Sequence, residues 1–362
     1  SLRRYSFLLI LSTLILGGIG LWGESLIGTG ARTPLNFGAL LGGLLLGAGS
    51  LATALLHRQR LTAVLMLGLV GLLTALLFAH FSAPDLALTQ LLIEIVTVIL
   101  LLLAMFFLPE RTPTEAPRLR RGRDAILGGL AGVGVAALSY AMLTHPADSI
   151  SAFHLAESKP GGGGTNVVNV ILVDFRGFDT LGEITVLGIA AVGILALLTG
   201  LALKGPRRDW LGRTWAPERH SVILVTISKL LLPIGLLVSA FLFLRGHNEP
   251  GGGFIAGLVT GVALILQYIA EGGRATRPRL RWDYLGVVGW GVLVATATGL
   301  GSWLVGFPFL TTTYTYVTWP LIGKFELASA MLFDRGVYLA VVGTVLIILA
   351  GFGRLGQREA TA

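Results

Sequence analysis

The chain contains no cysteine and few charged residues, and both shortages narrow the classes of protein to which it can belong. Without cysteine it cannot form disulfides, bind zinc or an iron–sulfur cluster through thiolates, or use a cysteine nucleophile. Charged residues make up 13% of the 362 residues, about half their usual share in soluble domains. Hydrophobic residues make up 54%, and the mean hydropathy is +0.80. This composition indicates an integral membrane protein.

Histidine is also sparse, which argues against a metal or haem centre. The six histidines lie at the ends of apolar stretches or between them, and no HExxH spacing occurs. We therefore expect no cofactor and no enzymatic activity. The net charge of +8 would be compatible with nucleic-acid binding, but the positive charges lie between the apolar stretches, so we expect no nucleic-acid partner.

Ten stretches of the sequence are apolar over enough residues to cross a bilayer. A spanning helix needs roughly 20 such residues at about 1.5 Å of rise each. The sequence therefore predicts an all-α polytopic membrane protein of about ten transmembrane helices, surrounded by membrane lipid. The stretches cover residues 7–22, 37–56, 61–81, 86–108, 125–143, 184–203, 222–244, 252–270, 284–305 and 336–352.

Lys and Arg are distributed unevenly between alternate connecting segments. With the N-terminus in the cytoplasm, 20 of the 27 fall on the inside and five on the outside. The remaining two are Lys229, within an apolar stretch, and Arg335, at the start of another. Cytoplasmic loops of membrane proteins carry an excess of Lys and Arg. We therefore expect the N- and C-termini of this chain to be cytoplasmic.

Two longer outer segments and one basic inner segment interrupt the regular pattern. Residues 144–183 contain a flexible glycine run at 161–164 and a strand-like run at 166–175. Residues 306–333 contain alternating threonine, tyrosine and valine at 311–318, which predicts a short hairpin or strand. The basic segment 204–220 is the expected boundary between a module of about six helices, 1–203, and one of about four, 221–362.

Glu94 is the acidic residue placed deepest in a predicted span. It lies about 12 Å from the start of its helix by helical rise, too deep for a carboxylate to reach water. Gln90 and Thr97 lie on the same helix face at spacings of four and three. Such a carboxylate is suited to a proton or sodium relay. The alternative is a protonated acid that only hydrogen-bonds a neighbouring helix.

Three further polar residues lie in or beside the predicted spans. Lys229 lies about 10 Å into its helix by helical rise, where it could serve transport or extend to the surface. His80 and Asp85 flank a tight turn, in which Asp85 fits both an ion path and a helix cap begun by Ser82. Pro233, on the helix of Lys229, predicts a kink.

Two polar clusters lie at predicted helix ends. The first contains Asp174, Arg176, Asp179 and Glu183 within ten residues, which predicts an ion-attracting vestibule or, with Thr180 and Glu183, a capping box. The second is a glycine-rich run that contains His247, Asn248 and Pro250. It lacks the lysine and serine of a phosphate-binding loop, so it predicts a sharp turn between helices.

Four motifs resemble subunits of Mrp-type multisubunit cation/proton antiporters. APDLALTQLLIEIVTV at 83–98 and DFRGFDTLGE at 174–183 are similar to the C-terminal part of the large A subunit. FLRGHNEPGGGF at 243–254 and LASAMLFDRGVY at 327–338 are similar to the B subunit. The resemblance covers most of the chain, as an A-subunit tail fused to a B subunit. Its modules are shared with membrane-bound hydrogenases.

The resemblance implies a function, partners and two site residues. It implies a membrane subunit of a bacterial or archaeal sodium/proton antiporter, which assembles with other small hydrophobic subunits and an antiporter-like proton-translocating module. It nominates Glu94 and Glu183 as acids on the ion path for Na⁺ and H⁺. The A subunit of that family begins with a large antiporter-like region that does not precede Ser1, so we expect this piece not to run a complete cycle alone.

The mechanism expected from these residues couples proton movement in the neighbouring module to sodium movement past Glu94, with Gln90 and Thr97 as oxygen ligands. Two other functions fit the same sequence. A membrane subunit of a redox-driven ion-pumping complex would share these motifs. A purely structural scaffold would tolerate neutral substitutions at Glu94 and Glu183.

Overall fold

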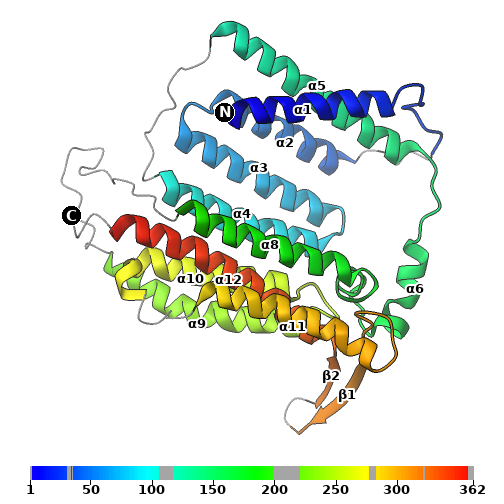
Figure 1. The fold of residues 1–362 in the computed structure, drawn as a ribbon, viewed down its shortest axis with the longest axis vertical. Helices are drawn as coiled ribbons and strands as arrows, with labels where there is room; N and C mark the ends of the chain where they lie inside the picture. Colours follow the sequence, from blue (N-terminus) through cyan, green and yellow to red (C-terminus); the bar gives the residue numbers. More distant parts are fainter. Residues whose placement is uncertain are drawn as a thin grey trace. The chain divides into compact units, whose positions relative to one another are not determined.

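The computed structural model describes residues 2–30, 34, 36–105, 117–198, 221–276, 283–320 and 323–357. The basic segment 204–220, expected to separate two modules, lies outside these residues. The described part is helical except for one hairpin (Figure 1). Its elements are α1 (Leu2–Gly20), α2 (Phe37–Leu55), α3 (Arg60–His80), α4 (Pro84–Met105), α5 (Arg118–Thr144), α6 (Ser151–Gly162), α7 (Val167–Val170), the π-helix η1 (Ile171–Phe175), α8 (Gly177–Leu198), α9 (Val222–Arg245), α10 (Gly253–Thr276), α11 (Tyr284–Leu304), β1 (Tyr314–Trp319), β2 (Gly323–Ala328) and α12 (Ala330–Gln357).

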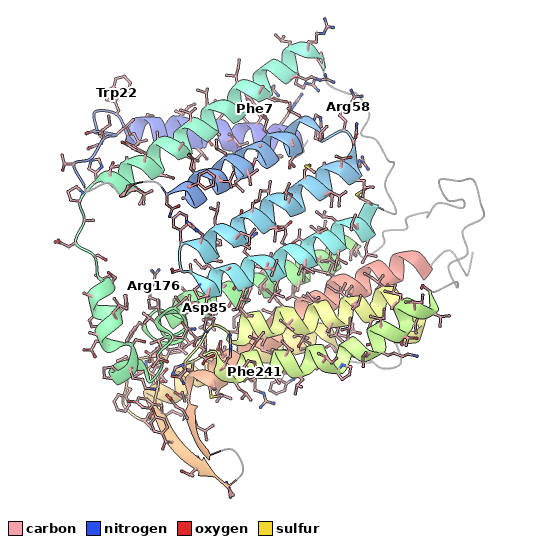
Figure 2. The ribbon with its side chains drawn as sticks, turned by 180° about the vertical axis from the view of Figure 1, so that it is seen from behind. Phe7, Trp22, Arg58, Asp85, Arg176 and Phe241 are labelled. Carbon is pink, nitrogen blue, oxygen red and sulfur yellow. The ribbon has the colours of Figure 1, made fainter. Side chains whose placement is uncertain are left out.

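The polytopic all-α architecture is confirmed. Nine of the helices in the described ranges are long and apolar enough to cross a membrane, and the stretch Arg4–Gly20 of α1 is a shorter apolar helix. Many large apolar side chains are exposed, among them Trp22 and Phe241 (Figure 2). Soluble monomers rarely expose apolar surface on this scale, whereas lipid and neighbouring membrane subunits can cover it.

The chain forms two compact units. The first contains residues Ser1–Phe37 and Thr112–Ile150, with α1 and α5. Within it the loop after α1 is held to the end of α5, because Thr144 accepts the N–H of Gly30 on its carbonyl oxygen at 2.7 Å. The second unit contains Gly38–Arg111 and Ser151–Ala362, and with them all the remaining transmembrane helices.

Helix α12 is the centre of the second unit. It packs against α8, α10 and α11, while α3 pairs with α4, and α10 also contacts α4 and α9. Phe333, Val337 and Ala340 of α12 are almost fully buried. The approach of α11 to α12 requires glycine: a Cβ on Gly291 would lie 2.6 Å from the carbonyl oxygen of Gly336. Small residues allow such close packing where lipid supplies no hydrophobic drive.

The two longer connecting segments differ from one another. In the second, the expected strands are present: β1 pairs antiparallel with β2, with Tyr314 opposite Ala328. In the first, the strand expected at 166–175 is wrong, because these residues form α7 and η1. Val170 and Val173 are buried at a helical spacing of three. A short apolar run does not distinguish a strand from a buried helix.

The glycine run 161–164 is not the flexible segment that its composition predicted. Gly162, Gly163 and Gly164 are buried. A Cβ on Gly163, whose φ is +79°, would lie 2.5 Å from the Tyr314 ring, and a Cβ on Gly164 would lie 2.3 Å from the carbonyl oxygen of His247. These glycines therefore permit close packing of the segment against β1 and the α9–α10 loop.

Candidate functional site

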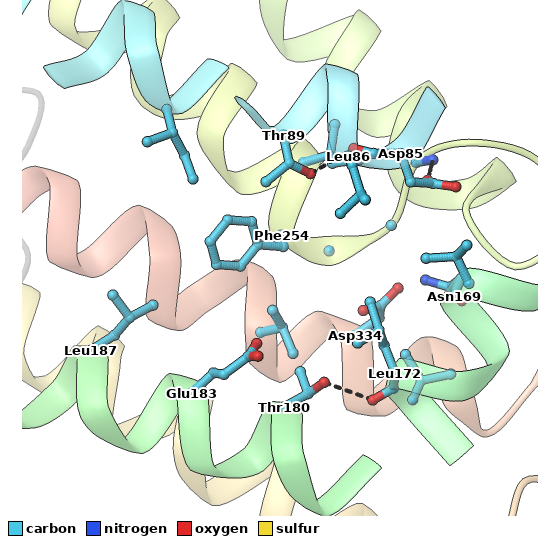
Figure 3. Close-up of a pocket in the computed structure, with 18 of the residues that line it drawn as sticks. Asp85, Leu86, Thr89, Asn169, Leu172, Thr180, Glu183, Leu187, Phe254 and Asp334 are labelled. Carbon is cyan, nitrogen blue, oxygen red and sulfur yellow. Dashed lines mark hydrogen bonds between the residues drawn. The ribbon is translucent and has the colours of Figure 1, made fainter. Parts of the chain in front are cut away.

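A cavity of about 620 Å³ lies in the second unit, lined by residues of α4, α7, η1, α8, α10, α12 and the turn before α10. Three carboxylic acids line it, Asp85 from α4, Glu183 from α8 and Asp334 from α12 (Figure 3). Most of the other lining side chains are apolar, including Phe254 and Leu187. Acids from three helices therefore meet in a mainly apolar cavity.

Asp85 is directed toward the glycine turn before α10. Its Oδ1 accepts the N–H of Gly251 at 3.0 Å. Pro84 begins α4, as proline does at first helical positions. The sequence allowed Asp85 to be a helix cap or an ion-path residue. In the structure its carboxylate does not cap its own helix but bonds a residue 166 positions away, which ties α4 to the turn.

Asp334 is the cavity acid that the sequence did not identify. It is only 8% exposed, and its carboxylate receives hydrogen bonds from the Gly253 N–H and the Asn169 side chain. The last span was predicted to begin at residue 336, whereas α12 begins at Ala330. The sequence therefore predicts Asp334 outside the spans, although it lies within the B-subunit-like motif 327–338.

Glu183 lies inside α8 rather than at its start. The helix begins at Gly177, seven residues before the predicted span. The Thr180 hydroxyl donates to the carbonyl oxygen of Leu172 at 2.7 Å, so it joins α8 to η1. Glu183 lines the cavity (Figure 3). The structure thus brings two predicted site residues, Asp85 and Glu183, to the same cavity.

Glu94 does not line this cavity but packs against α3. A Cβ on Gly71 would lie 1.9 Å from its Oε2, and one on Gly68 would lie 3.8 Å from its Oε1. The Oε1 atom is buried and has no hydrogen-bond partner. Gln90 is half-buried and Thr97 is exposed on the same helix. The Glu94 side chain therefore occupies a notch that glycine provides.

This notch predicts that Gly71→Ala destabilises the protein through Glu94. The new methyl group would force the glutamate into another rotamer, and we expect the free energy of unfolding to fall by about 1–3 kcal/mol, as for other overpacked sites. The same substitution in a Glu94→Ala background should cost less, because the clashing atoms are gone. Denaturant unfolding in detergent measures both. Equal costs in the two backgrounds would contradict the notch, and Gly47→Ala, which meets nothing within 4 Å, is the control.

Lys229 forms an ion pair with Glu271 across α9 and α10, with 3.6 Å between Nζ and Oε1. The Glu271 side chain is 6% exposed. The predicted span ended at residue 270, but α10 continues to Thr276, so this acid was missed. At the end of α3, the His80 ring packs edge-on against Phe81 at 5.2 Å. Neither Lys229 nor His80 lines the carboxylate cavity.

The predicted vestibule residues separate into two groups. Arg176 and Asp179 form an exposed ion pair. Asp174 turns inward, and its Oδ2 accepts the N–H of Thr312 at 3.0 Å. Burial raises the pKa of Asp174, and the bond from Thr312 opposes that rise. Asp174 therefore anchors the segment that leads into β1.

The turn predicted at 246–254 is present and is held by its own polar residues. Arg245 Nε donates to the carbonyl oxygen of Pro250 at 2.9 Å. His247 Nε2 lies 3.0 Å from the carbonyl oxygen of Gly162, and Asn248 Nδ2 donates to Glu326 Oε2 at 3.2 Å. The turn is thus connected to the glycine run and to the hairpin. Within the described ranges, no group of three or more His, Cys, Asp and Glu is arranged to hold a metal ion.

Three family models match successive parts of the chain. Residues 45–110 match the D subunit of MBH, residues 119–205 match the E subunit of MBH, and residues 223–347 match a domain related to the MnhB subunit of Na⁺/H⁺ antiporter. The cavity acids are divided between these matches. Asp85 and Glu183 lie in the first two, and Asp334 lies in the third.

Curated relatives and a solved structure cover the chain in the same order. A probable K⁺/H⁺ antiporter A/B subunit of Rhizobium meliloti is 45% identical over 85% of this chain and 33% of its own length. The Na⁺/H⁺ antiporter B subunit of Bacillus subtilis is 46% identical over 38% of this chain and 95% of its own. A chain of the Mrp complex from Dietzia sp. DQ12-45-1b, 32% identical with a TM-score of 0.85, matches 98% of this chain and 39% of its own. The chain thus spans about a third of the A/B relative.

Proposed function

Because this chain belongs to the Mrp family of multisubunit cation/proton antiporters, as the C-terminal part of an A subunit joined to a B subunit, we propose that it is a membrane component of such an antiporter. In this proposal it is part of a secondary transporter and not an enzyme. It assembles with other small hydrophobic subunits and with an antiporter-like module that moves protons. Its cargo is H⁺ and a monovalent cation, Na⁺ by our expectation.

The observation that carries this proposal is the cavity with Asp85, Glu183 and Asp334. Acids within a membrane are costly and mark ion or proton paths by default. Carboxylate oxygens suit hard monovalent cations, and the same groups can carry protons. Because the three acids come from α4, α8 and α12, ion binding there would act on three helices together.

The other predicted residues receive supporting roles in this proposal. Glu94, with Gln90 and Thr97, extends the path along α4, and Lys229 with Glu271 lies on α9 and α10. Residues 1–203 form the A-like module and 221–362 the B-like module, joined by 204–220. The charge distribution favours cytoplasmic termini.

The proposal is tested by neutralising the cavity acids in the assembled complex. In inverted membrane vesicles, we expect Glu183→Gln and Asp334→Asn each to lower cation-driven proton movement at least tenfold, because an amide neither carries the proton nor balances the cation. The amount of assembled complex, measured by native gel, should stay unchanged. Glu157→Gln, the same change at an exposed position on α6, is the control. Normal exchange by both cavity variants would refute this ion path.

A redox-driven complex is the second candidate, because two of the three family models are MBH subunits. The proteins that co-purify in mild detergent distinguish the two functions. Only hydrophobic antiporter subunits should co-purify with an antiporter component, whereas a redox-driven complex also requires a protein that carries a redox centre.

A further inference from the structure

Two asparagines one helical turn apart, Asn166 and Asn169, are fixed to the loop before α10. Asn166 caps α7, and its side-chain oxygen accepts the N–H of Asn169 at 3.3 Å. Its Nδ2 donates to the carbonyl oxygens of Gly246 at 3.1 Å and Glu249 at 3.0 Å. Asn166 is 8% exposed and Asn169 is 7% exposed. The asparagine pair is therefore part of the packed interior of the second unit.

The Asn169 side chain reaches the Asp334 carboxylate across Gly252. It hydrogen-bonds Asp334 together with the Gly253 N–H, and it lies beside Asp334 at the cavity (Figure 3). A Cβ on Gly252 would lie 2.8 Å from Asn169 Nδ2 and 3.2 Å from Asp334 Oδ2. The amide nitrogen has donors only, so its bond to a carboxylate favours the ionised form.

Asp334 needs such donors because it is buried, at 8% exposure, and burial disfavours the charged form of a carboxylate. The other ionisable groups that line the cavity are Asp85 on α4 and Glu183 on α8, both acids. Arg245, at the end of α9, acts on Asp85. Among the described residues that line the cavity, none is Lys or Arg. With no basic side chain in this lining, Asn169 and the Gly253 N–H supply the local compensation for the buried carboxylate.

We propose that Asn169 is a positioning residue that holds Asp334 in the cavity in its ionised form, ready to take up either a cation or a proton. The inference rests on the proposed function, since it assigns a task in the same ion path. Asn169 lies in the part matched to the E subunit of MBH, and Asp334 lies in the MnhB-related part. Their contact therefore links the A-like and B-like modules at the cavity.

The test replaces Asn169 with leucine, which has a similar volume but no donor, in the full chain within its assembled complex. In inverted vesicles energised by respiration, NaCl- and KCl-driven proton movement is measured against pH. We expect the Asn169→Leu profile to shift by about one unit toward higher pH, and the half-saturating cation concentration at the wild-type optimum to rise about tenfold, as for loss of a hydrogen bond to a charged group. The amount of assembled complex should not change.

Swapping the side chains of Asn169 and Asp334 distinguishes a positioning role from a packing role. Asn169→Asp combined with Asp334→Asn restores one carboxylate and one amide across the contact, so the double variant should recover part of the exchange that Asp334→Asn alone loses. Thr298→Val removes a hydroxyl that bonds only the carbonyl oxygen of Val294 in α11, and should leave the profile unchanged.

The possible results distinguish the inference from the proposed function. A wild-type profile for Asn169→Leu, with exchange still lost in Asp334→Asn, would overturn the inference alone. The inference would also be overturned if Asn169→Leu lowered the amount of assembled complex but left the pH profile of each assembled complex unaltered. Asn169 would then be structural only. If the intact wild-type complex exchanged neither Na⁺ nor K⁺ for protons, the proposed function itself would fail.

Discussion

Replacing Gly253 with alanine is expected to lower cation/proton exchange by the assembled complex more than tenfold. An alanine Cβ at this position would lie 2.1 Å from the backbone oxygen of Asp334 and 3.1 Å from its Oδ1. A backbone atom cannot rotate away as a side chain can, so α10 or α12 must shift. The shift would separate Asp334 from the Gly253 N–H that hydrogen-bonds it. Both the cavity and the hydrogen bonding of its most buried acid would change.

Gly253→Ala is also expected to destabilise the folded protein. Overpacking of this kind lowers the free energy of unfolding by about 1–3 kcal/mol, which thermal unfolding in detergent detects. Vesicle assays measure the loss of exchange, expected to exceed tenfold per assembled complex. Gly193→Ala on α8 is the matched control, since its new methyl group would meet nothing within 4 Å. Equal activity of the two variants would show that the turn can move without effect.

The turn that contains Gly253 was predictable in kind but not in its contacts. A run of three glycines after proline indicates a sharp bend, and Gly252 indeed has a φ of +103°. The sequence did not indicate that acids from α4 and α12 would bond the amides of this turn. Such contacts join residues far apart in the chain and arise only from packing of the helices.

The acids of the cavity lie where the length of an apolar stretch no longer predicts the bounds of a helix. It predicted the long helices well, because lipid requires continuous apolar runs. It predicted their ends poorly: α8 begins seven residues early and α12 six residues early, and these extensions contain Glu183 and Asp334 respectively. Polar residues that line a cavity interrupt the apolar pattern, so functional ends of helices are the places where this criterion fails.

The asparagine pair was missed for a different reason. Asn166 and Asn169 lie in a run that reads equally as a strand or a helix, and the side-chain cap that selects the helix is visible only in the structure. Their partners, Glu249 and Asp334, lie in the B-like part of the chain. A single sequence predicts local capping far better than pairing between modules.

Acidification is expected to loosen the contacts between the glycine run, the α9–α10 loop and the hairpin. His247 is 6% exposed and its Nδ1 has no hydrogen-bond partner. Burial lowers its pKa from 6.5, while the negative charges of Glu326 and Asp174 oppose the shift and the positive charge of Lys159 reinforces it. A lowered pKa means that the folded state binds fewer protons than the unfolded chain. The stabilisation of the folded state by the neutral His247 ring is therefore complete above about pH 6.5, and it is lost as the pH falls below that value.

Lys159 determines how high the pH can rise before the same contacts are weakened. Its Nζ donates to the carbonyl oxygen of Gly163 at 2.6 Å and to Glu326 at 3.0 Å. Burial alone would lower its pKa, but the contacts with Glu326 and Tyr316 raise it above 10.5. A raised lysine pKa stabilises the folded state below the unfolded value and loses this effect as the pH rises through the folded pKa. The contacts should thus be firmest between about pH 6.5 and 10.5.

Hydrogen exchange of the purified complex, followed from below to above this pH range, measures the effect directly. Peptides covering 158–166 and 246–249 should exchange several-fold faster at pH 5.5 than at pH 7.5, after correction for the intrinsic rate. His247→Gln keeps a donor for the Gly162 carbonyl but cannot be protonated, so it should remove the acid response and leave the alkaline one. Lys159→Met should do the reverse. An acid response that persists in His247→Gln would assign it to another group and overturn this explanation.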